Sequence, residues 1–399
     1  MDVVKEITRF NAGRDPQRLQ LKYLKMRSDP FAFLRGSCHL FYARLPRSGI
    51  FRSAPVVWSC GDLHLENFGS YKGDNRLAYF DMNDFDEAAL APASWDVVRM
   101  LTSLRIGGRS LGLTQRDAGA LPEVFLRHYG AALSAGKAYW VEHPTAEGLV
   151  KHLLDDLRDR QRKDFLAART QLKGKRRTLT VDGKKALPAS SAQRAKVSSF
   201  MADFARKQER PDFYEVLDIA RRIAGTGSLG LERFVILVRG KGSPDGHYLL
   251  DLKETRPSSM APRLQTPQPV WRTEAHRVVE VQRRLQAVPM AFLQAVMLGK
   301  MPCVLKGLQP TQDRVVLDAA RQSLSQIEQV VAGMARIVAW AQLRSGGRQG
   351  SATTDELMAF AQGRKWRHKL LEASALCAQQ TLEDAATFAE AHDDGVFRP

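Results

Sequence analysis

The sequence is poor in cysteine and has no long apolar run, and each absence excludes a class of protein. Its four cysteines, Cys38, Cys60, Cys303 and Cys377, lie far apart, without a C-x-x-C pair and without histidines at the spacing of a zinc site. We therefore expect neither a disulfide framework nor structural zinc, and free thiols suit a cytoplasmic location. The N-terminus lacks a signal-peptide core, and the most apolar stretch, 288–298, is too short to span a bilayer.

Acidic residues are too few to balance the basic ones. The chain has 43 Asp and Glu against 60 Lys and Arg, which gives a formal net charge of +17. Segment 169–185 has one acid, Asp182, and its basic residues are Arg169, Lys173, Lys175, Arg176, Arg177, Lys184 and Lys185. Such a run suits a solvated loop, an anionic substrate or a nucleic acid, although its lack of aromatic residues disfavours binding of single strands. We expect anionic partners rather than a cationic aminoglycoside, with nucleic acid less favoured than a nucleotide.

Two short blocks early in the chain have a pattern typical of phosphoryl transfer. The first, from Cys60 to Asn67, reads C-G-D-L-H-L-E-N, and the second, 83–86, reads N-D-F-D. Protein kinases carry H-R-D-L-x-x-x-N followed by D-F-G, where the first Asp orients the acceptor hydroxyl and the Asn and second Asp hold magnesium. Here Cys60 replaces the His, and His64 stands where many kinases have a Lys. Turn and cap hydrogen bonds of Asp62 and Asn67 would also explain the first block taken alone.

A glycine-rich segment later in the chain favours the kinase interpretation. Gly225, Gly227 and Gly230 form a G-x-G-x-x-G motif. The apolar run that follows it, 234–238, predicts a strand, and a second predicted strand ends in Lys253. In a dinucleotide-binding fold the glycines would follow a strand and open a helix, whereas here they precede a hairpin. A kinase loop has this context, since its backbone covers the triphosphate while the Lys neutralises phosphate charge. The alternative is an ordinary hairpin with Lys253 as a surface charge.

The two motif sets stand in the reverse of the kinase order, because the glycine-rich segment comes about 160 residues after the first block. A circular permutation reconciles them, since domain termini often lie close together. We predict an α+β, protein-kinase-like two-lobed fold, circularly permuted, with a mostly helical large lobe. Its parts would be 1–140 with the catalytic loop and metal-binding Asp, a basic helical or loop insert at 141–212, a small nucleotide-binding lobe at 213–308 and the helical remainder of the large lobe at 309–399. Two half-sites meeting across a dimer, with Lys253 against Asp84 of another chain, would also explain the order.

Seven blocks spread over the chain carry a resemblance to a known family. They are Asp29–Gly36, Gly61–Gly69, Phe80–Glu87, Pro92–Arg99, Gly225–Gly230, Lys253–Glu254 and Arg277–Arg283. In these blocks and their order the chain resembles the bacterial domain-of-unknown-function family 2252, grouped with kinase-like and aminoglycoside-phosphotransferase-like proteins. Segment 136–210 has none of the blocks, and 338–344 departs from the Ala-His-Ala-Arg run of similar proteins. The resemblance implies a kinase-like fold but does not supply a reaction.

The kinase pattern predicts a role for the polar residues of the first two blocks. Asp62 would orient or deprotonate the acceptor hydroxyl. Asn67 would bind a magnesium ion, and a carboxylate after the next strand would bind the second. Asp84 is the first candidate because 84–86 mimics D-F-G. Asp81, closer to the kinase spacing from Asn67, is the second, and Asp86 is the third.

The same pattern predicts the residues around the nucleotide. The loop residues expected at the phosphates are Gly225, Gly227, Ser228 and Gly230. Lys253 would hold the phosphates and needs an acidic partner on the following helix, with Glu280 as the first choice and Glu274 as the alternative. His64 would donate to the transferring phosphoryl group or simply brace its loop, and Asp96 is expected to brace the loop as well. The aromatic residues expected to pack beside these motifs are Trp58, Phe68, Phe80 and Trp95.

Hydrophobic spacing and terminal signals predict the main elements. Helices are expected at 16–26, from 30 onward, and at 95–104, 121–135, 274–285, 319–343 and 354–391. Strands are expected at 56–58, 77–80, 234–238, 248–253 and 303–305. Together these inferences predict an enzyme that moves the γ-phosphoryl group of Mg-ATP to a hydroxyl acceptor oriented by Asp62. The alternatives are AMP transfer at the same site and a pseudokinase that binds nucleotide as a scaffold, although the retained Asp62, Asn67, Asp84 and Lys253 argue against an inactive site.

Overall fold

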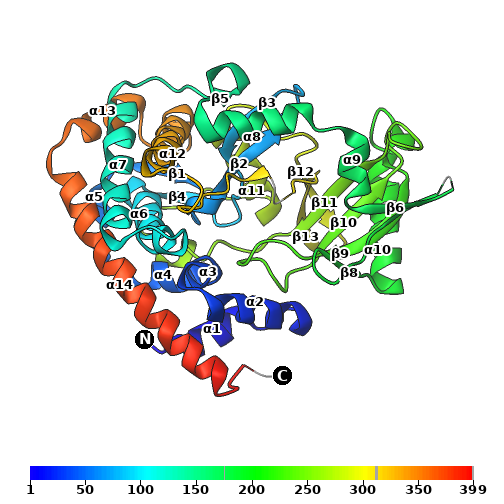
Figure 1. The fold of residues 1–399 in the computed structure, drawn as a ribbon, viewed down its shortest axis with the longest axis horizontal. Coiled ribbons are helices and arrows are strands. Elements are labelled where there is room, and N and C mark those ends of the chain that lie inside the picture. Colours follow the sequence, from blue (N-terminus) through cyan, green and yellow to red (C-terminus); the bar gives the residue numbers. More distant parts are fainter. Residues whose placement is uncertain (175, 311–312, 398–399) are drawn as a thin grey trace.

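The computed structural model describes residues 1–174, 176–310 and 313–397, and it joins a helical part to a part built around an antiparallel sheet (Figure 1). The helical part, at the left of Figure 1, contains helices α1–α8 and α12–α14 with the short strands β1–β5. The sheet part, at the right, contains β6–β13 with α9, α10 and α11. This mixture of helices and antiparallel strands confirms the predicted α+β class.

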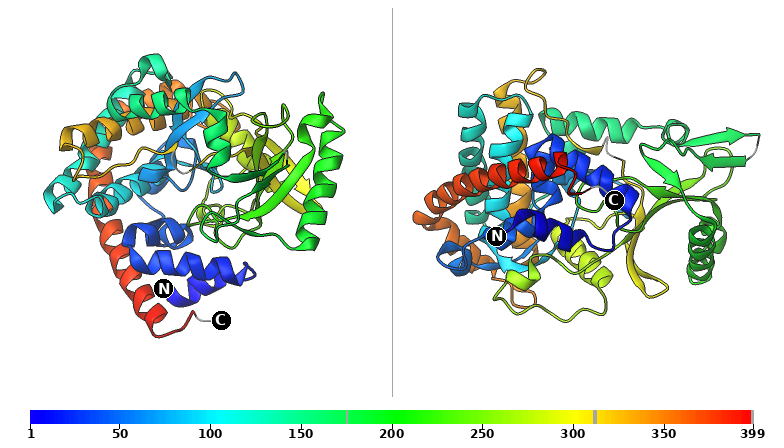
Figure 2. Two further views of the ribbon diagram at one scale, coloured as in Figure 1. Left: turned by 45° about the vertical axis from the view of Figure 1, so that its right-hand side comes forward. Right: turned by 90° about the horizontal axis from the view of Figure 1, so that it is seen from below.

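Both ends of the chain build the helical part. Its helices are α1 (Val3–Asn11), α2 (Pro16–Ser28), α3 (Pro30–Gly36), α4 (Cys38–Arg44), α5 (Ile50–Ser53), α6 (Ala93–Ser110), α7 (Gln115–Ser134), α8 (Gly148–Asp159), α12 (Leu324–Ser345), α13 (Thr354–Gln362) and α14 (Lys365–Asp393). Helix α6 is buried on nearly every side because α7 and α14 pack against it, while α12 packs against α7. Figure 2 shows α14 lying along the N-terminal helices, so the two ends of the chain meet.

Local capping explains where several helices begin and end. Asp29 accepts hydrogen bonds from the N–H groups of Phe31 and Ala32, with Pro30 as the first residue of α3, as the sequence predicts. The helix expected over 354–391 is instead two helices, because the chain leaves α13 at Gly363 before α14 begins. Among the described residues, no helix is long and apolar enough to cross a membrane.

Short strands in the helical part carry the first two sequence blocks. β1 (Val56–Ser59) pairs with β4 (Ala89–Pro92), while β2 (Phe68–Lys72) pairs with β3 (Ala78–Met82), which also pairs with β5 (Val141–Glu142). A single 3₁₀ turn, Leu65–Asn67, leads into β2. The Asp62 loop therefore follows β1, and the Asp84 loop follows β3 and leads into β4.

The sheet part has six antiparallel strands in the order β12-β13-β11-β10-β9-β8. Their bounds are β8 (Ala186–Pro188), β9 (Val216–Arg222), β10 (Arg233–Val238), β11 (Tyr248–Glu254), β12 (Gln294–Leu298) and β13 (Met301–Gly307). Alternation along the strands sends Phe234, Ile236 and Leu252 to one face, where α10 (Ser191–Ala205) covers them. The other face carries the charged residues Arg233, Asp251 and Lys253. Helix α11 (Glu274–Leu285) joins β11 to β12 and has the predicted bounds.

The basic insert expected at 141–212 is not a unit of its own. Helix α8 packs on α12, whereas β8 and α10 belong to the sheet part, so the sheet begins before the expected boundary at 213. The rest of the insert forms α9 (Arg162–Ala167) and a hairpin of β6 (Thr170–Lys173) and β7 (Arg176–Leu179). This hairpin projects from the sheet part in Figure 2. A strand as short as β8 has too few residues to show an alternating pattern in the sequence.

Candidate functional site

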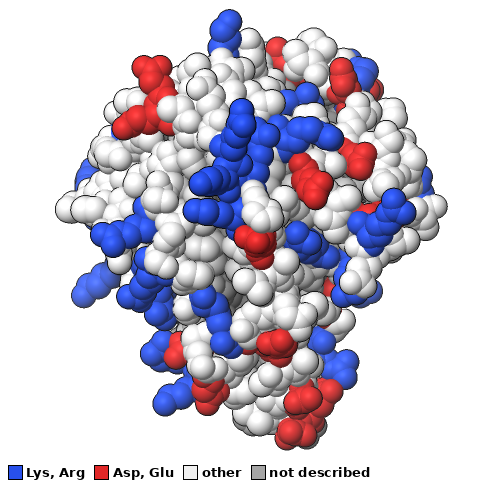
Figure 3. Space-filling model, turned by 90° about the vertical axis from the view of Figure 1, so that its left-hand side faces the viewer, with Lys and Arg blue, Asp and Glu red and all other residues white. Residues whose placement is uncertain are grey.

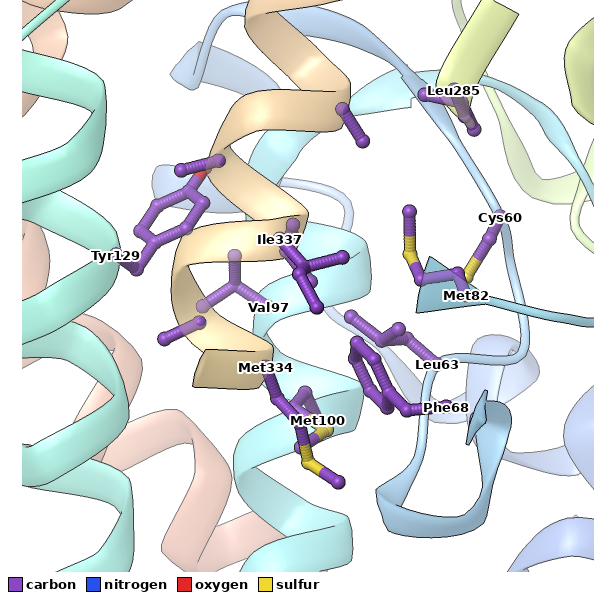
Figure 4. Close-up of a cluster of buried hydrophobic side chains, with 14 of the residues drawn as sticks. Cys60, Leu63, Phe68, Met82, Val97, Met100, Tyr129, Leu285, Met334 and Ile337 are labelled. Atoms are coloured by element: carbon purple, nitrogen blue, oxygen red, sulfur yellow. The ribbon is translucent and has the colours of Figure 1, made fainter. Parts of the chain in front are cut away.

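The loop that carries Asp62 is anchored by its apolar residues. Cys60 and Leu63 are buried and point toward the side chains of α6 and α12, together with Met82 from β3 (Figure 4). Phe68, which follows the loop, is buried in the same cluster. The flanking aromatic residues of the sequence prediction, Trp58, Phe68, Phe80 and Trp95, are all buried core residues. Because the apolar positions of this block point into the core, its polar residues are left for the other side of the loop.

Asp96 holds the backbone of the same loop. Its carboxylate oxygens accept hydrogen bonds from the N–H groups of Cys60 and Gly61 at 2.9 and 3.0 Å, as expected of a bracing residue. Burial raises the pKa of Asp96 to about 6 against the opposing effect of these two hydrogen bonds. Gly61 has φ of +87°, and a Cβ there would lie 2.1 Å from the carbonyl oxygen of Glu87. Only glycine fits this position.

Asp62 itself is oriented by Arg99, a buried residue of α6 that the sequence interpretation did not single out. Arg99 Nε donates to Asp62 Oδ1 at 2.8 Å, and its Nη2 binds the same oxygen. The guanidinium lies 4.8 Å from the ring centroid of Phe41, and this cation–π contact also favours its position. Burial opposes the charge of Arg99, but Asp62 outweighs it and the pKa of Arg99 is raised. Asp62 is thus a fixed, partly exposed carboxylate (22% of its side chain).

Asn67 ties the Asp62 loop to the Asp84 loop. Its amide nitrogen donates to the carbonyl oxygens of Asp62 and Asp84 at 2.9 and 3.3 Å. Its amide oxygen accepts from the Asp84 N–H at 2.9 Å. The two blocks that the sequence separates by a hairpin are therefore joined directly, and the amide oxygen expected to bind a metal is engaged with backbone in this structure.

Lys253 reaches the Asp84 loop from the sheet part. Its Nζ lies 3.6 Å from Asp84 Oδ1 and forms an ion pair with Asp86. Partial desolvation opposes ionisation of Asp84, whose side chain is half-exposed, but Lys253, Lys306 and Arg233 outweigh it and lower its pKa. Burial and the charge of Asp84 raise the pKa of Asp86. One chain is sufficient for this contact, so the motif order does not require two half-sites in a dimer.

The glycine-rich loop between β9 and β10 lies over Asp62. A Cβ built on Gly227 would lie 4.0 Å from Asp62 Oδ2, so the loop is in contact range of the carboxylate, and only 3.2 Å from the Arg35 carbonyl oxygen, which favours glycine there. Gly225 and Gly230 have φ of +73° and +91°, which favours glycine at both. Ser228 Oγ turns back to the carbonyl oxygen of Ala224 at 3.4 Å. Their conformations explain why this segment repeats glycine.

Cations from helix α2 and from the turn before it hold the carbonyl groups of this loop. Arg14 Nη1 donates to the carbonyl oxygens of Gly227 and Leu229 at 2.7 and 3.0 Å, and Lys22 Nζ lies 3.3 Å from the Gly227 oxygen. Arg18 Nη1 binds the Leu231 oxygen at 2.7 Å. Burial lowers the pKa of Arg14 to about 10 and that of Lys22 well below its usual value. In the described parts of the chain, the N–H groups of Gly227 and Ser228 donate no hydrogen bond.

His64 is buried in its loop. Its Nδ1 accepts from the N–H of Glu66 at 3.1 Å, which places the proton of the neutral ring on Nε2. Burial, with Arg35, Arg99 and Arg314 adding to it, lowers the pKa of His64 well below its usual value, so the ring is neutral near pH 7. The contact supports loop bracing, one of its two predicted roles, and leaves Nε2 as the donor for the other.

Three acidic residues named from the sequence make no ion pair with Lys253 in the parts of the chain that the structure describes. Asp81 Oδ1 accepts from the Met82 N–H at 2.8 Å, and burial raises its pKa to about 6. Glu280, the first choice as partner of Lys253, instead binds Arg283 on its own helix, and Glu274 binds Arg277. The expected Lys253–Glu280 pair is therefore replaced by Lys253 with Asp84 and Asp86.

Helix α11 presents a cation rather than an acid to the Asp84 loop. Arg277 Nη1 donates to the Ala88 carbonyl oxygen at 2.6 Å, and its Nη2 donates to those of Asp86 and Arg256 at 2.8 and 3.0 Å. The sequence interpretation placed Arg277 in a family block without a role. Its phase could have indicated one, because Val278, Val281 and Leu285 share the buried side of the helix with it.

A second charged group beside Lys253 was also missed. Asp251, two residues before Lys253 on the same face of β11, binds Arg233 Nε at 2.9 Å and Arg222 Nη1 at 2.6 Å. Burial opposes its charge, yet the two arginines lower the pKa of Asp251 well below its usual range. Lys306 stands opposite Asp251 in the register of β13. A period of two in β11 is the sequence signal that could have placed Asp251 and Lys253 together.

The basic segment is partly structural. Arg177 in β7 is buried and donates to the Pro244 carbonyl oxygen at 2.8 Å, and Asp182 Oδ1 accepts the N–H groups of Lys184 and Lys185. Lys175 lies outside the described residues. The positive charge is not confined to this segment, because on the face shown in Figure 3 Lys and Arg side chains cover more of the surface than Asp and Glu.

Comparison with known proteins gives a family and nothing finer. No curated protein and no solved structure matches the chain. The sequence model of a family described as "Uncharacterized protein conserved in bacteria (DUF2252)" matches residues 14–391, which include both charged loops, the glycine-rich loop and the N-terminal cations. With nearly its whole length matched, this chain belongs to the DUF2252 family.

Proposed function

We propose that this protein is a Mg²⁺- and ATP-dependent phosphotransferase with a kinase-like, circularly permuted arrangement of its parts. The contact between Lys253 and the Asp84–Asp86 loop carries the proposal. It joins residues about 170 positions apart, at the place where Gly227 also approaches Asp62. The acceptor-orienting carboxylate, the metal-binding carboxylates, the phosphate-binding Lys and a glycine-rich loop are the groups that such a transfer needs.

The charge and backbone of the sheet part suit the phosphates of a nucleotide. Lys253, Arg233 and Lys306 bring positive charge to the Asp84 loop, as their effects on its pKa indicate. Arg14 and Lys22 hold the Gly227 carbonyl oxygen, while the Gly227 and Ser228 N–H groups remain free to donate among the described residues. A loop of this kind attracts anions because its amides are unsatisfied.

The carboxylates suit a magnesium ion that is bound partly by phosphate and water, rather than a metal ion enclosed by protein ligands alone. Among the described residues, no group of three or more His, Cys, Asp and Glu is placed to hold a metal ion. Mg²⁺ commonly needs only one or two carboxylates, with phosphate oxygens and waters completing its shell. Asp84 and Asp86 would supply these, and Asn67 would fix the Asp84 loop rather than bind the ion. When bound, the ion supplies positive charge to the phosphate oxygens.

Asp62 would orient the acceptor. Arg99 holds Oδ1, while Oδ2 faces the glycine-rich loop, where the terminal phosphate would lie. A hydroxyl that donates to this oxygen is positioned for in-line attack. Neutral His64 would offer Nε2–H as a donor beside it.

Thermal unfolding with ATP tests the proposal. Wild type should unfold at higher temperature with millimolar ATP and Mg²⁺ than with either alone, because a ligand of the folded state stabilises it by about 2.7 kcal/mol at 100 times Kd. Asp84→Ala should lose the Mg²⁺-dependent part of the shift. Asp74→Ala, at an exposed turn of the β2–β3 hairpin, is the matched control and should keep it. A wild type that shows no shift would overturn the proposal.

The products of ATP turnover distinguish phosphoryl from AMP transfer. With water as a slow acceptor, a phosphotransferase releases ADP and phosphate, because the bond to the γ-phosphorus breaks. Release of AMP and pyrophosphate would contradict the proposal and would indicate that ATP binds in the reverse sense.

A further inference from the structure

A cavity of about 80 Å³ lies beside the start of the glycine-rich loop, between the sheet and the insert. Ala224, Val235 and Leu308 line it from the sheet part, and Ala168, Leu179 and Ala186 line it from the segment around the β6–β7 hairpin. None of these residues belongs to the two motif sets on which the proposed function rests. The cavity therefore calls for an explanation of its own.

The cavity adjoins the charged residues around Lys253, because Arg222 lines it and binds Asp251, which precedes Lys253 by two residues on β11. Ala224 directly precedes Gly225, and its carbonyl oxygen accepts from Arg233 Nη1 at 3.2 Å. Arg233 stands opposite Lys253 in the register of β10 and β11. The cavity is therefore a neighbouring space for the remaining atoms of a molecule whose phosphates lie under the glycine-rich loop and on Lys253.

Size and lining indicate what those atoms are. One water needs about 10–15 Å³ of such space, so 80 Å³ has room for several waters, and a two-ring base displaces a similar number. The side chains of Val235, Leu179, Ala186 and Leu308 offer apolar contact to the faces of a flat ring. The polar lining residues are Arg169, Thr180, Asp182, Lys185 and Arg222, and Arg222 is already held by Asp251 and by the Gln309 carbonyl oxygen.

We propose that this cavity takes the base of a nucleoside triphosphate, and that the basic insert is thereby part of the nucleotide site. The inference rests on the proposed function and adds where the base of its nucleotide is held, so that the base and not the phosphates alone contributes to binding. It also gives the hairpin region a role other than attraction of anions, since its Leu179 and Ala186 contribute apolar surface.

Equilibrium binding of ATP and of tripolyphosphate, both with Mg²⁺, tests this on the full chain. Wild type should bind ATP at least roughly tenfold more tightly, the gain expected from burying about 60 Å² of ring surface. Ala168→Trp places a large side chain at the exposed rim, where it should block the base without disturbing the core. It should remove the preference by weakening ATP alone, and Ala186→Phe, which fills the cavity from β8, should do the same.

Ala167→Trp is the matched control, because Ala167 is the exposed neighbour of Ala168 and does not line the cavity. It should leave both affinities unchanged. Equal affinity of wild type for the two ligands would overturn the base site and keep the phosphate site. An unchanged ATP preference in Ala168→Trp and Ala186→Phe would also overturn it. Absence of binding for both ligands would remove the proposed function together with this inference.

Discussion

Two charged clusters share one face of the six-stranded sheet, and they differ in how far they are closed. Asp251 is fully buried, and both of its oxygens are bound by Arg222 or Arg233. In the neighbouring cluster, Lys253 is as buried as those arginines, but the side chains of Asp84 and Asp86 remain 53% and 29% exposed. The first cluster is complete without a ligand, whereas the second leaves carboxylate oxygens available. The difference identifies the Asp84 loop as the side at which something else binds.

The pKa shifts of the carboxylates also differ between the closed and the open cluster. In the closed cluster, two cations share one carboxylate, and its pKa falls well below the usual range against the effect of burial. In the open cluster, two carboxylates share Lys253, and the pKa of Asp86 rises because of burial and the nearby charge of Asp84. The open cluster differs in that its carboxylate oxygens remain accessible, so they can take up a bound cation.

The largest effect is expected when the closed cluster is broken. Asp251→Ala leaves Arg222 and Arg233 buried without their carboxylate, and removing one partner of a buried pair typically costs about 3–5 kcal/mol. The free energy of unfolding from urea titration measures it. Glu215→Ala, which removes one half of the exposed ion pair with Arg239, should change stability by less than about 1 kcal/mol. A loss of similar size in both variants would mean that the cluster is not closed as described.

Asp81 differs from the carboxylates of both clusters, because it is buried without a direct ion pair among the described residues. Its hydrogen bonds come from backbone N–H groups, and the charge of Arg344 acts on it from α12. Its pKa is about 6 in the folded protein against 3.8 ordinarily, so between these values the folded state binds the extra proton. Wild-type stability should therefore rise from this group as pH falls from about 7 to about 4, by up to about 3 kcal/mol.

Asp81→Asn has no such titration. Urea unfolding at a series of pH values should show that the free energy of unfolding of wild type increases relative to that of the variant as pH falls. Asp74→Asn, at an exposed position, should give a difference that does not depend on pH. A pH-independent difference for Asp81→Asn would contradict the raised pKa.

The local hydrophobic pattern predicted the bounds of helix α11 well. The kinase analogy was wrong about which side chain of this helix faces the Asp84 loop, because long-range packing decides that. The bounds of α11 follow from its apolar spacing, and the same spacing explains the error at Glu280. Val278 and Val281 set the buried side of the helix, which leaves Glu280 on the opposite side with Arg283 and turns Arg277 inward. Kinase analogy placed an acid there, and helical phase would have argued against it.

In the candidate site, too, the sequence predicted the local contacts and missed the long-range ones. Asp62 and Asn67 lie within one loop, so their spacing was enough to bring them together. Arg99 on α6 and Arg14 in the turn before α2 act on this site from outside the motifs, and neither has a local signal. Only the folded chain shows that a cation from α6 fixes Asp62 and that a residue just before α2 fixes the glycine-rich loop.

The smallest change in stability is expected where the open cluster loses its cation. Lys253→Met removes a charge whose partners can turn toward water, so unfolding should change by less than about 1 kcal/mol, even though Lys253 is as buried as Arg233. The same variant should lose most of the stabilisation by Mg-ATP, because its phosphate-binding charge is gone. Lys300→Met, in the exposed turn between β12 and β13, removes an equal charge and should alter neither quantity. If Lys253→Met instead destabilised the fold as much as Asp251→Ala, both clusters would be structural, and the Asp84 loop would lose its standing as the binding side.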